Sequence, residues 1–596
     1  MVETLAVDER CRDLLLCEQL SDDAIHERLS PIGFADWRAA YACLLRMADN
    51  PQLKLALADA LPHLLMTLSG TASPDRALVN LERFAGSAPD RLALYYYLAS
   101  NPRAVEILVT LFTGSQFLTE ILLRHPEYFS RLTELKHLAR LKSADQFYVE
   151  AQAAVTPPGE VARQLDALRR FQRLELMRIG ACDLLDLFDL PAVTLQLSNL
   201  ADSLVQVCLG IASEQSNTNP SGFAVIAMGK LGGQELNYSS DIDLLFLAHL
   251  DAFAYRRLGE RLIEALASVT SEGFLYRVDM RLRPWGQVGA LVSSLDGYMA
   301  YLDQHARLWE KQALLKARAI AGDPAVGNEF LRRADALLFG ASLETVRAEV
   351  HAMKQRTEAQ LRQQGRDWGE VKLGEGSIRD VEFVAQYLQL AHGAQQPDIR
   401  SRNTLDALAR LSAHELIGAD EYRVLVEGYT FLRTVEHHLQ MMHYRQTDTL
   451  PNEPEALAHL ARRLGFRGKA AGDQFLARYQ QHGAAVRAIY LRHVGSKPMP
   501  TATDSPSLPP APDVGRHVAR MDPSYSTAFS EQDIRRHAAL AEQLDADHLV
   551  KVDAAALDDG RWRVTIVGYD YAGELSLICG LLFAYGFNIH DGDVFT

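Results

Sequence analysis

Hydrophobic residues recur at helical spacing through the first third of the chain. Between residues 117 and 123, the apolar positions 117, 118, 121 and 122 fall on one face of a helix. Seven prolines between residues 31 and 126 separate these helices rather than interrupt long ones. We therefore predict an all-helical domain over residues 1–205.

The pattern then changes to short apolar runs, which are typical of buried strands. Residues 223–228 form the first run and end at Gly229, 242–247 form the second, and 274–282 the third. Residues 256–271 between the last two runs have the pattern of a helix. A small mixed sheet with helices is expected over residues 206–345.

Helical periodicity returns after this sheet and continues over residues 346–495. In this part, Phe383, Val384, Tyr387 and Leu388 share one helical face. Proline, serine and threonine then dominate residues 496–520, a composition that cannot form a core and behaves as a stiff linker.

Beyond the linker, residues 521–596 contain a predicted strand at 563–568, a helix at 575–585 and a last strand at 587–595. One such unit is thin for a free-standing domain, which predicts a shortened module or one completed by another chain. The fold class expected for the chain is mostly α, with an embedded α/β core and a partial βαβ module after the linker.

Composition narrows the class of protein. The chain has 596 residues, 48% hydrophobic and 23% charged, so disorder is excluded as its general state. A net charge of −15 argues against a nucleic-acid surface. An acidic start, six scattered cysteines and the lack of a run of ~18 apolar residues predict a cytoplasmic protein with reduced thiols and no membrane contact.

The candidate chemistry begins where the first predicted strand ends. Gly229 and Lys230 open a glycine-rich turn whose backbone amides can approach phosphate oxygens. Asp241 and Asp243 then open the second strand, and their spacing of two places both carboxylates on one face while Ile242, Leu244 and Phe246 point into the core. Two hard oxygen ligands side by side suit Mg²⁺.

The third predicted strand supplies a third carboxylate and several arginines to this predicted site. Its one face carries Asp279 among Arg277, Arg281 and Arg283, which fits a site for a metal-bound polyphosphate. We therefore expect Asp241, Asp243 and Asp279 to be the catalytic and Mg²⁺-binding residues. The nucleotide-binding residues expected are Gly229, Lys230, Ser240 and Arg281.

Each piece alone has a simpler interpretation. The Ser240–Asp243 segment is able to cap a turn before a strand, and alternating arginines are common on a solvated sheet face. Lys230 alone is typical of a surface lysine. The combination of strand, glycine-rich turn, Asp-x-Asp and a third aspartate on a later strand is much more specific.

These residues resemble the nucleotidyltransferase superfamily, and more narrowly the glutamine synthetase adenylyltransferase/adenylyl-removing enzymes. The matching positions include residues 229–244, 277–284, Trp309-Glu310 and 316–318 in the core, and further motifs lie in the helices on both sides: residues 80–84, 115–118, 168–171, 372–374, 378–383 and 450–451.

The resemblance implies a reaction. Members of this family carry one transferase domain that removes AMP from a tyrosine of glutamine synthetase and another that attaches it, whereas this chain has one. Residues 235–243 and 378–383 look more like the removing half, which implies that inorganic phosphate attacks the AMP–tyrosine linkage and yields ADP. ATP, ADP and phosphate are the expected substrates or products, and glutamine synthetase the expected partner.

The chain departs from the family pattern at two places. Ser377 stands where the family usually has a second glycine before Ile378. In place of a second transferase domain there is the linker and a module similar to the ACT-type sensing domain of PII uridylyltransferases, matched by residues 564–567, Asp570, Gly573 and Asn588-Ile589. This similarity implies glutamine as an effector and the PII protein as a further partner.

Three alternatives to the removing direction stay open at this point. In the first, the single domain works in the adenylylating direction and uses ATP. In the second, it uridylylates the PII protein, although the family motifs in the flanking helices argue against this. In the third, it is a non-catalytic nitrogen-sensing scaffold, although the three intact aspartates argue against this.

Overall fold

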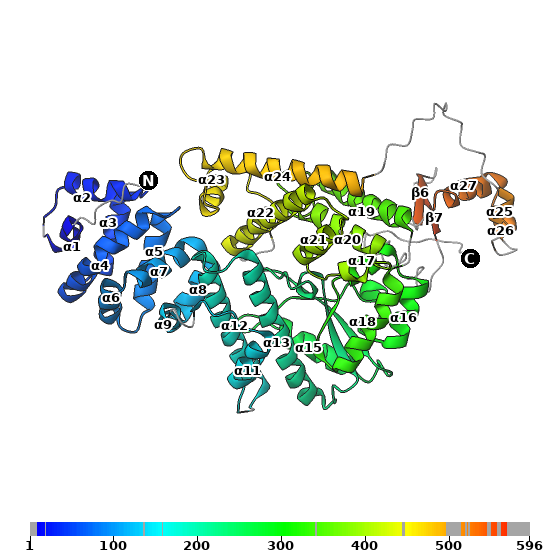
Figure 1. The fold of residues 1–596 in the computed structure, drawn as a ribbon, viewed down its shortest axis with the longest axis horizontal. Helices are drawn as coiled ribbons and strands as arrows, with labels where there is room; N and C mark the ends of the chain where they lie inside the picture. Colours follow the sequence, from blue (N-terminus) through cyan, green and yellow to red (C-terminus); the bar gives the residue numbers. More distant parts are fainter. Residues whose placement is uncertain are drawn as a thin grey trace. The chain divides into compact units, whose positions relative to one another are not determined.

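The computed structural model describes residues 9–568 except 18, 135–137, 158, 340–341, 444–446, 496–513, 519–520, 522–524, 545–549 and 557–561 (Figure 1). The chain divides into two compact units, residues 1–497 and 498–596. The first unit holds the predicted sheet together with the helices on both sides of it, so the candidate site lies in this unit.

The first part of this unit is helical, as predicted. In α8 the buried residues include Leu118, Ile121 and Leu122, which confirms the predicted face. Pro62 differs from expectation because it lies inside α4, buried among leucines, rather than between helices. The helices are α1 Asp13–Leu16, α2 Asp22–Leu29, α3 Trp37–Met47, α4 Pro51–Ser69, α5 Pro74–Ser87, α6 Arg91–Ser100, α7 Pro102–Gly114, α8 Gln116–Arg124, α9 Tyr128–Thr133, α11 Ala144–Ala154, α12 Val161–Leu184 and α13 Leu190–Ser216.

Helix α13 runs without a break through position 205, where the sequence suggested a boundary. Its residues pack in one core with both the preceding helices and the sheet. Among the described residues it is the one helix long and apolar enough to cross a membrane, and 83% of its apolar window is buried inside the protein, as in a core helix.

The sheet is mixed, as predicted, and its strand order is β3-β2-β1-β5, with β4 also paired to β2. Strand β1 pairs antiparallel with β2 and β5, whereas β3 and β4 run parallel to β2. The elements are β1 Phe223–Met228, α14 Gly229–Gly232, β2 Ile242–Ala248, α15 Arg256–Ala267, β3 Val278–Asp279, β4 Val292–Ser294, α16 Leu295–Gln304, α17 Leu308–Leu314, β5 Arg318–Gly322 and α18 Pro324–Leu338.

Both faces of the sheet are covered, so the central strands are buried on each side. Phe246 and its neighbours at alternate positions pack with α13 and α15. Leu245 and Leu247, on the same side of β2 as Asp243, pack with α16, α18 and the helices that follow (Figure 1). The strand therefore buries its second face as well, and only its first residues leave polar side chains at the sheet edge.

The third predicted strand is much shorter than expected. The prediction of a strand over residues 274–282 is wrong except at Val278 and Asp279. The backbone amides of Leu275 and Tyr276 donate to the carbonyl of Leu266 at the end of α15, so this part of the segment pairs with a helix end. Beyond β3, the Asp279 side chain accepts from the backbone amide of Arg281, which turns the chain away.

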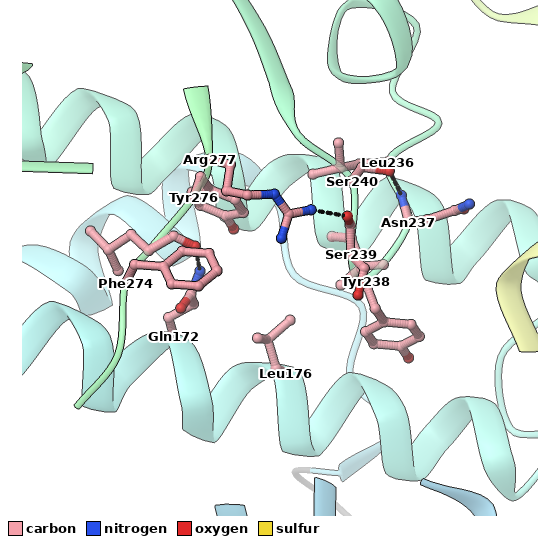
Figure 2. Close-up of a pocket in the computed structure, with 12 residues that line it drawn as sticks. Gln172, Leu176, Leu236, Asn237, Tyr238, Ser239, Ser240, Phe274, Tyr276 and Arg277 are labelled. Atoms are coloured by element: carbon pink, nitrogen blue, oxygen red, sulfur yellow. Dashed lines mark hydrogen bonds between the residues drawn. The ribbon is translucent and has the colours of Figure 1, made fainter. Parts of the chain in front are cut away.

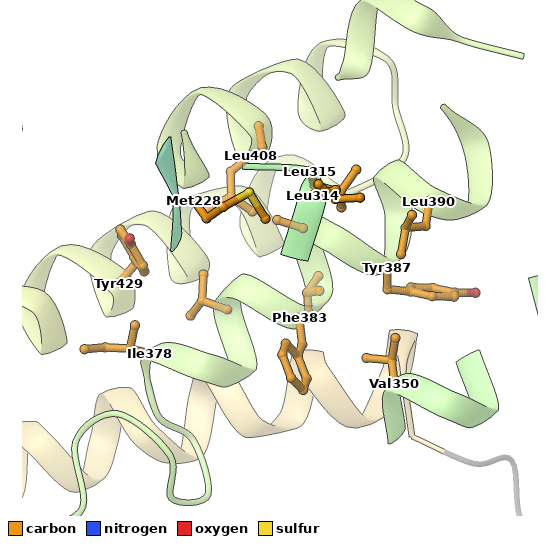
Figure 3. Packing of buried hydrophobic residues seen from close by; sticks show 14 of the residues in the cluster. Met228, Leu314, Leu315, Val350, Ile378, Phe383, Tyr387, Leu390, Leu408 and Tyr429 are labelled. Carbon is orange, nitrogen blue, oxygen red and sulfur yellow. The ribbon is translucent and has the colours of Figure 1, made fainter. Parts of the chain in front are cut away.

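Six helices follow the sheet: α19 Leu343–Gln363, α20 Ile378–His392, α21 Thr404–Ala413, α22 Ala419–His443, α23 Pro454–Arg463 and α24 Ala471–His493. Phe383, Val384, Tyr387 and Leu388 are all buried on α20, which confirms their shared face. The same core contains Met228 of β1, so the sheet and these helices have a continuous apolar interior (Figure 3).

A buried ionic network also joins the sheet to these helices. The Lys316 ammonium donates to Glu235 (2.7 Å) and to Glu382 of α20 (2.8 Å). The Arg433 guanidinium of α22 donates to the backbone carbonyl of Glu235 (2.6 Å) and to the Asn237 side chain (2.8 Å). Because each charge has opposite charges or carbonyls around it, the turn between β1 and β2 is held against α20 and α22. We call these residues, with Lys230 and Glu436, the interface network.

The second unit contains α25 Val514–Val518, α26 Tyr525–Ala528, α27 Glu531–Ala541, β6 Val550–Ala556 and β7 Trp562–Gly568. Strand β7 confirms the strand predicted at 563–568, and its antiparallel partner β6 was missed. The helix predicted at 575–585, the strand at 587–595 and half of the ACT-like match (Asp570, Gly573 and Asn588-Ile589) lie outside the described residues, so they stay predictions.

Replacing Lys316 with methionine tests the interface network. This change leaves the buried carboxylate of Glu235 without its cation and removes the closer of the two cations beside Glu382. Breaking a buried ion pair in this way typically costs about 3–5 kcal/mol. We expect the free energy of unfolding of the first unit, measured in urea, to fall by that amount. The exposed Lys469→Met is the control and should change it by less than ~0.5 kcal/mol; equal effects of the two variants would contradict the role of the network.

Candidate active site

The turn after β1 brings Gly229 directly against Asp243. Gly229 has a φ of +55°, and a Cβ built on it would lie 2.3 Å from a carboxylate oxygen of Asp243. The glycine is thus required both for its left-handed backbone and for the close approach of this carboxylate. The predicted glycine-rich turn takes the form of one helical turn, α14, that begins at Gly229.

The three predicted carboxylates lie at one edge of the sheet. Asp241 immediately precedes β2, and Asp243 pairs in register with Asp279 of the parallel strand β3. Arg277 donates to the Asp241 carboxylate, and Arg281 donates through its side chain and backbone to Asp279. The structure therefore places Asp241, Asp243 and Asp279 as neighbours, with an arginine beside two of them.

Asp243 is the carboxylate of this group for which no hydrogen bond or ion pair is found among the described residues. Burial, together with the negative charges of Asp279 and Asp241, raises the pKa of Asp243 to about 6, although Lys372 and Arg281 act in the opposite direction. Burial also acts to raise the pKa of Asp279, but the hydrogen bonds from Arg281 outweigh this effect and lower the pKa of that carboxyl. The unbalanced negative charge is thus concentrated at Asp243.

The donor chemistry of this edge fits a hard divalent cation, because carboxylate oxygens are the ligands that Mg²⁺ prefers. Within the described part of the chain, however, no three acidic, histidine or cysteine side chains converge closely enough to ligate one ion. Asp241 and Asp279 are each directed to an arginine instead. These arginines have to give way for all three carboxylates to share a cation.

Lys230, predicted to contact nucleotide phosphates, is engaged elsewhere in this structure. Its ammonium forms an ion pair with the fully buried Glu436 of α22, 206 residues further along the chain. Burial lowers the pKa of Lys230 to about 8, partly offset by Glu436. Ser240 has a local role in addition, since its hydroxyl accepts from the backbone amide of Asn237 (3.3 Å).

Sequence reasoning missed a cation that the helices contribute. Lys372, in the loop before α20, acts electrostatically on Asp243, Lys230 and Glu436 and therefore lies near all three. Among the described residues, its ion-pair partner is Asp448, at the long distance of 3.8 Å, so the ammonium is only weakly held. Its sole signal in the sequence was its place in a family motif.

Two family models match the chain. The first, glutamate–ammonia ligase adenylyltransferase, matches residues 105–333, which contain the sheet and all three aspartates. Residues 105–333 form a domain of that family. The second model, the GlnD PII-uridylyltransferase, matches residues 344–492, which are helices α19–α24.

Curated relatives agree with the first model. Bifunctional glutamine synthetase adenylyltransferase/adenylyl-removing enzymes of Streptomyces avermitilis and Streptomyces coelicolor are 34% and 33% identical over 78% of this chain and 46% of their own length. The enzyme of the same description from Thioalkalivibrio sulfidiphilus is 35% identical over 63% of this chain and 41% of its own. The chain thus spans less than half the length of these relatives.

The serine that departs from the family pattern fits its place. The positive φ of the turn falls on Gly376, whereas Ser377 has an ordinary φ of −90°. The buried ammonium of Lys354 donates to the carbonyls of Leu373 and Gly374 and reaches the Ser377 hydroxyl at 3.3 Å. The turn that carries Lys372 therefore accommodates serine without strain.

A small hollow, partly open to solvent, lies beside Ser240 and Arg277. Figure 2 shows Gln172 and Phe274 on one side of it and Tyr238 and Ser239 on the other. The side-chain oxygens of Gln172 and Ser239 are buried and have no hydrogen-bond partner among the described residues. The hollow has room for a group about the size of one water molecule, which is too little for a ring of a substrate.

Gly229→Ala tests the close approach of the turn to Asp243. A left-handed alanine costs about 1–2 kcal/mol by itself, and the clash with the Asp243 carboxylate adds to that cost. Gly365→Ala is the matched control, because Gly365 has a similar φ of +61° and nothing within 4 Å of its added Cβ. We expect a larger loss of unfolding free energy in urea for Gly229→Ala; equal losses would contradict the packing described.

Proposed function

We propose that this protein is a Mg²⁺-dependent nucleotidyltransferase that transfers AMP at a tyrosine of glutamine synthetase, in the removing direction. The observation that carries the proposal is the placement of Asp241, Asp243 and Asp279 side by side at the open edge of β2 and β3. The match of residues 105–333 to the adenylyltransferase family, and the similarity to bifunctional glutamine synthetase adenylyltransferase/adenylyl-removing enzymes, support the choice of substrate.

In this direction an oxygen of inorganic phosphate attacks the phosphorus of the AMP group. The phosphorus–oxygen bond to tyrosine breaks, the tyrosine oxygen takes up a proton, and the products are ADP and free tyrosine. Mg²⁺, held by Asp241, Asp243 and Asp279, supplies positive charge that offsets the charge developing on the phosphoryl oxygens.

The chain's own residues bind and orient the reacting groups. Arg277 and Arg281, which pair with Asp241 and Asp279 in this structure, lie at the sheet edge where they would contact phosphate oxygens of the substrate. Lys372 adds a third positive charge from the helical side.

A second candidate, uridylylation of the PII protein, is favoured by one observation, the match of residues 344–492 to the PII-uridylyltransferase model. That match covers helices outside the carboxylate site, so it bears on what the helices recognise more than on the chemistry. Transfer from labelled UTP to PII, with none at glutamine synthetase, would support this candidate.

The paired substitutions Asp241→Asn and Asp243→Asn test the proposal directly. With AMP-modified glutamine synthetase, Mg²⁺ and phosphate, we expect the unchanged protein to release ADP and the variant to lose at least ~10³-fold in rate, since the ion's ligand charge is removed with little change of volume. ADP is followed by chromatography.

A parallel reaction holds unmodified glutamine synthetase and labelled ATP. Label transfer there would reverse the proposed direction. If neither ADP release nor label transfer occurs, and circular dichroism shows that the protein is folded, the result would favour the non-catalytic scaffold. Full activity of the asparagine variant would exclude the carboxylate mechanism.

Lys372→Met tests the cation contributed by the helices. A charge that contacts a transferred phosphoryl group contributes about 2–3 kcal/mol, so we expect kcat to fall by about 30–160-fold. Lys372→Arg should recover part of the rate, and the exposed Lys469→Met should leave it unchanged. If the methionine variant keeps kcat and changes only stability, Lys372 has a structural role.

A further inference from the structure

Helices α8, α22 and α23 meet at a junction that contains none of the three site aspartates. The Ser115 hydroxyl, which caps α8, donates to the backbone carbonyl of Met441 in α22 (2.9 Å). Helix α22 in turn packs on both α8 and α23 (Figure 1). This part of the first unit is therefore well fixed, and its side chains have defined neighbours.

Positive charge is in excess at this junction. Arg463, in the last turn of α23, interacts electrostatically with Arg76 of α5 and with His438 of α22. The one carboxylate that acts on Arg463 is Asp183, and it is already used: its oxygen contacts Nε2 of His437 at 2.6 Å and the Tyr238 hydroxyl at 3.2 Å. Among the residues that the structure describes, no other acidic side chain acts on Arg463.

The donors of Arg463 are buried without a partner. Both of its terminal nitrogens, Nη1 and Nη2, are shielded from solvent and make no hydrogen bond to any residue that the structure describes. The Nδ1 atoms of His437 and His438 are also buried and have no hydrogen-bond partner among the described residues. Native proteins leave few buried polar groups unsatisfied, and an unpaired buried charge is the costliest kind.

Electrostatics at these groups agree with the geometry. Burial, with a contribution from Arg76, lowers the pKa of Arg463 to about 10. Burial and the charge of Arg463 lower the pKa of His438 to about 3, so this imidazole is neutral and adds no competing charge. Arg76 keeps its own hydrogen bond to the Gln116 side chain (2.8 Å) and contributes its charge at longer range.

We propose that Arg463, with His438 and the charge of Arg76, forms a binding site for a small oxyanion, a phosphate or carboxylate group of a metabolite. The planar guanidinium presents Nη1 and Nη2 to two oxygens at once, which is the arrangement by which arginine binds both groups. The bound anion satisfies the two buried donors and neutralises the excess charge at the junction. This site is separate from the carboxylate site and does not depend on the proposed function.

Isothermal titration calorimetry tests the site with two probes, inorganic phosphate and glutarate, in buffer without Mg²⁺. We expect at least one probe to bind the unchanged protein at a single site, and Arg463→Met to weaken that binding at least tenfold. Arg462→Met is the matched control, because Arg462 is the exposed neighbour on the same helix turn, and it should bind as the unchanged protein does. Preference for phosphate or for glutarate identifies which oxyanion the site takes.

The Asp241→Asn/Asp243→Asn variant separates this site from the proposed active site, and it should keep the affinity. Loss of binding in that variant, with binding intact in Arg463→Met, would overturn the proposal. So would failure of both probes to bind the unchanged protein.

Thermal unfolding gives an independent readout. Without a probe, Arg463→Met should raise the unfolding midpoint, because methionine removes a buried charge that has no partner. A saturating probe should raise the midpoint of the unchanged protein and leave that of Arg463→Met unaltered. A lower midpoint for Arg463→Met would show that the arginine is a structural contact and would overturn the proposal.

Discussion

The burial of opposite charges between the turn after β1 and helices α20 and α22 is the constraint on which the rest of the site depends. Glu235 accepts from Lys316 and from the backbone of Thr404, and Arg433 closes the same turn from the other side. Buried charges tolerate little displacement, because a lost partner leaves an uncompensated ion. The interface network therefore fixes where the sheet edge lies relative to the loop that carries Lys372.

Much of the fold follows from local pattern. Strands β1 and β2 are continuous apolar runs because both faces of the sheet are covered, and such runs are easy to recognise. The third strand was overestimated because alternation alone cannot show where hydrogen-bond partners lie. The backbone amides of Leu275 and Tyr276 donate to a carbonyl at the end of α15 instead of to a strand. The Asp279 side chain accepts a hydrogen bond from the backbone amide of Arg281. Strand β6, with its run of three alanines, gave too weak a signal to be predicted.

The carboxylates of the site and the arginines beside them were predictable, whereas the contacts of the two lysines were not. Spacing placed Asp241 and Asp243 on one side of β2, and the parallel pairing of β3 brought Asp279 beside them. No local pattern joins Lys230 to Glu436, which are 206 residues apart, or brings Lys372 to the sheet edge. Such pairs are set by how the helices pack on the sheet, which is information that a single sequence carries only diffusely.

Helix α13 limits the positions at which recombination can divide this chain without disrupting its fold. Its residues belong to one core with the helices before it and the strands after it, so a genetic exchange within residues 190–216 would cut through a shared interior. The division between the two compact units falls instead at residues 497 and 498, within the proline-rich part of the sequence. Recombination that keeps the fold is thus expected to join or exchange whole modules at the proline-rich segment, and to pass residues 9–495 on as one block.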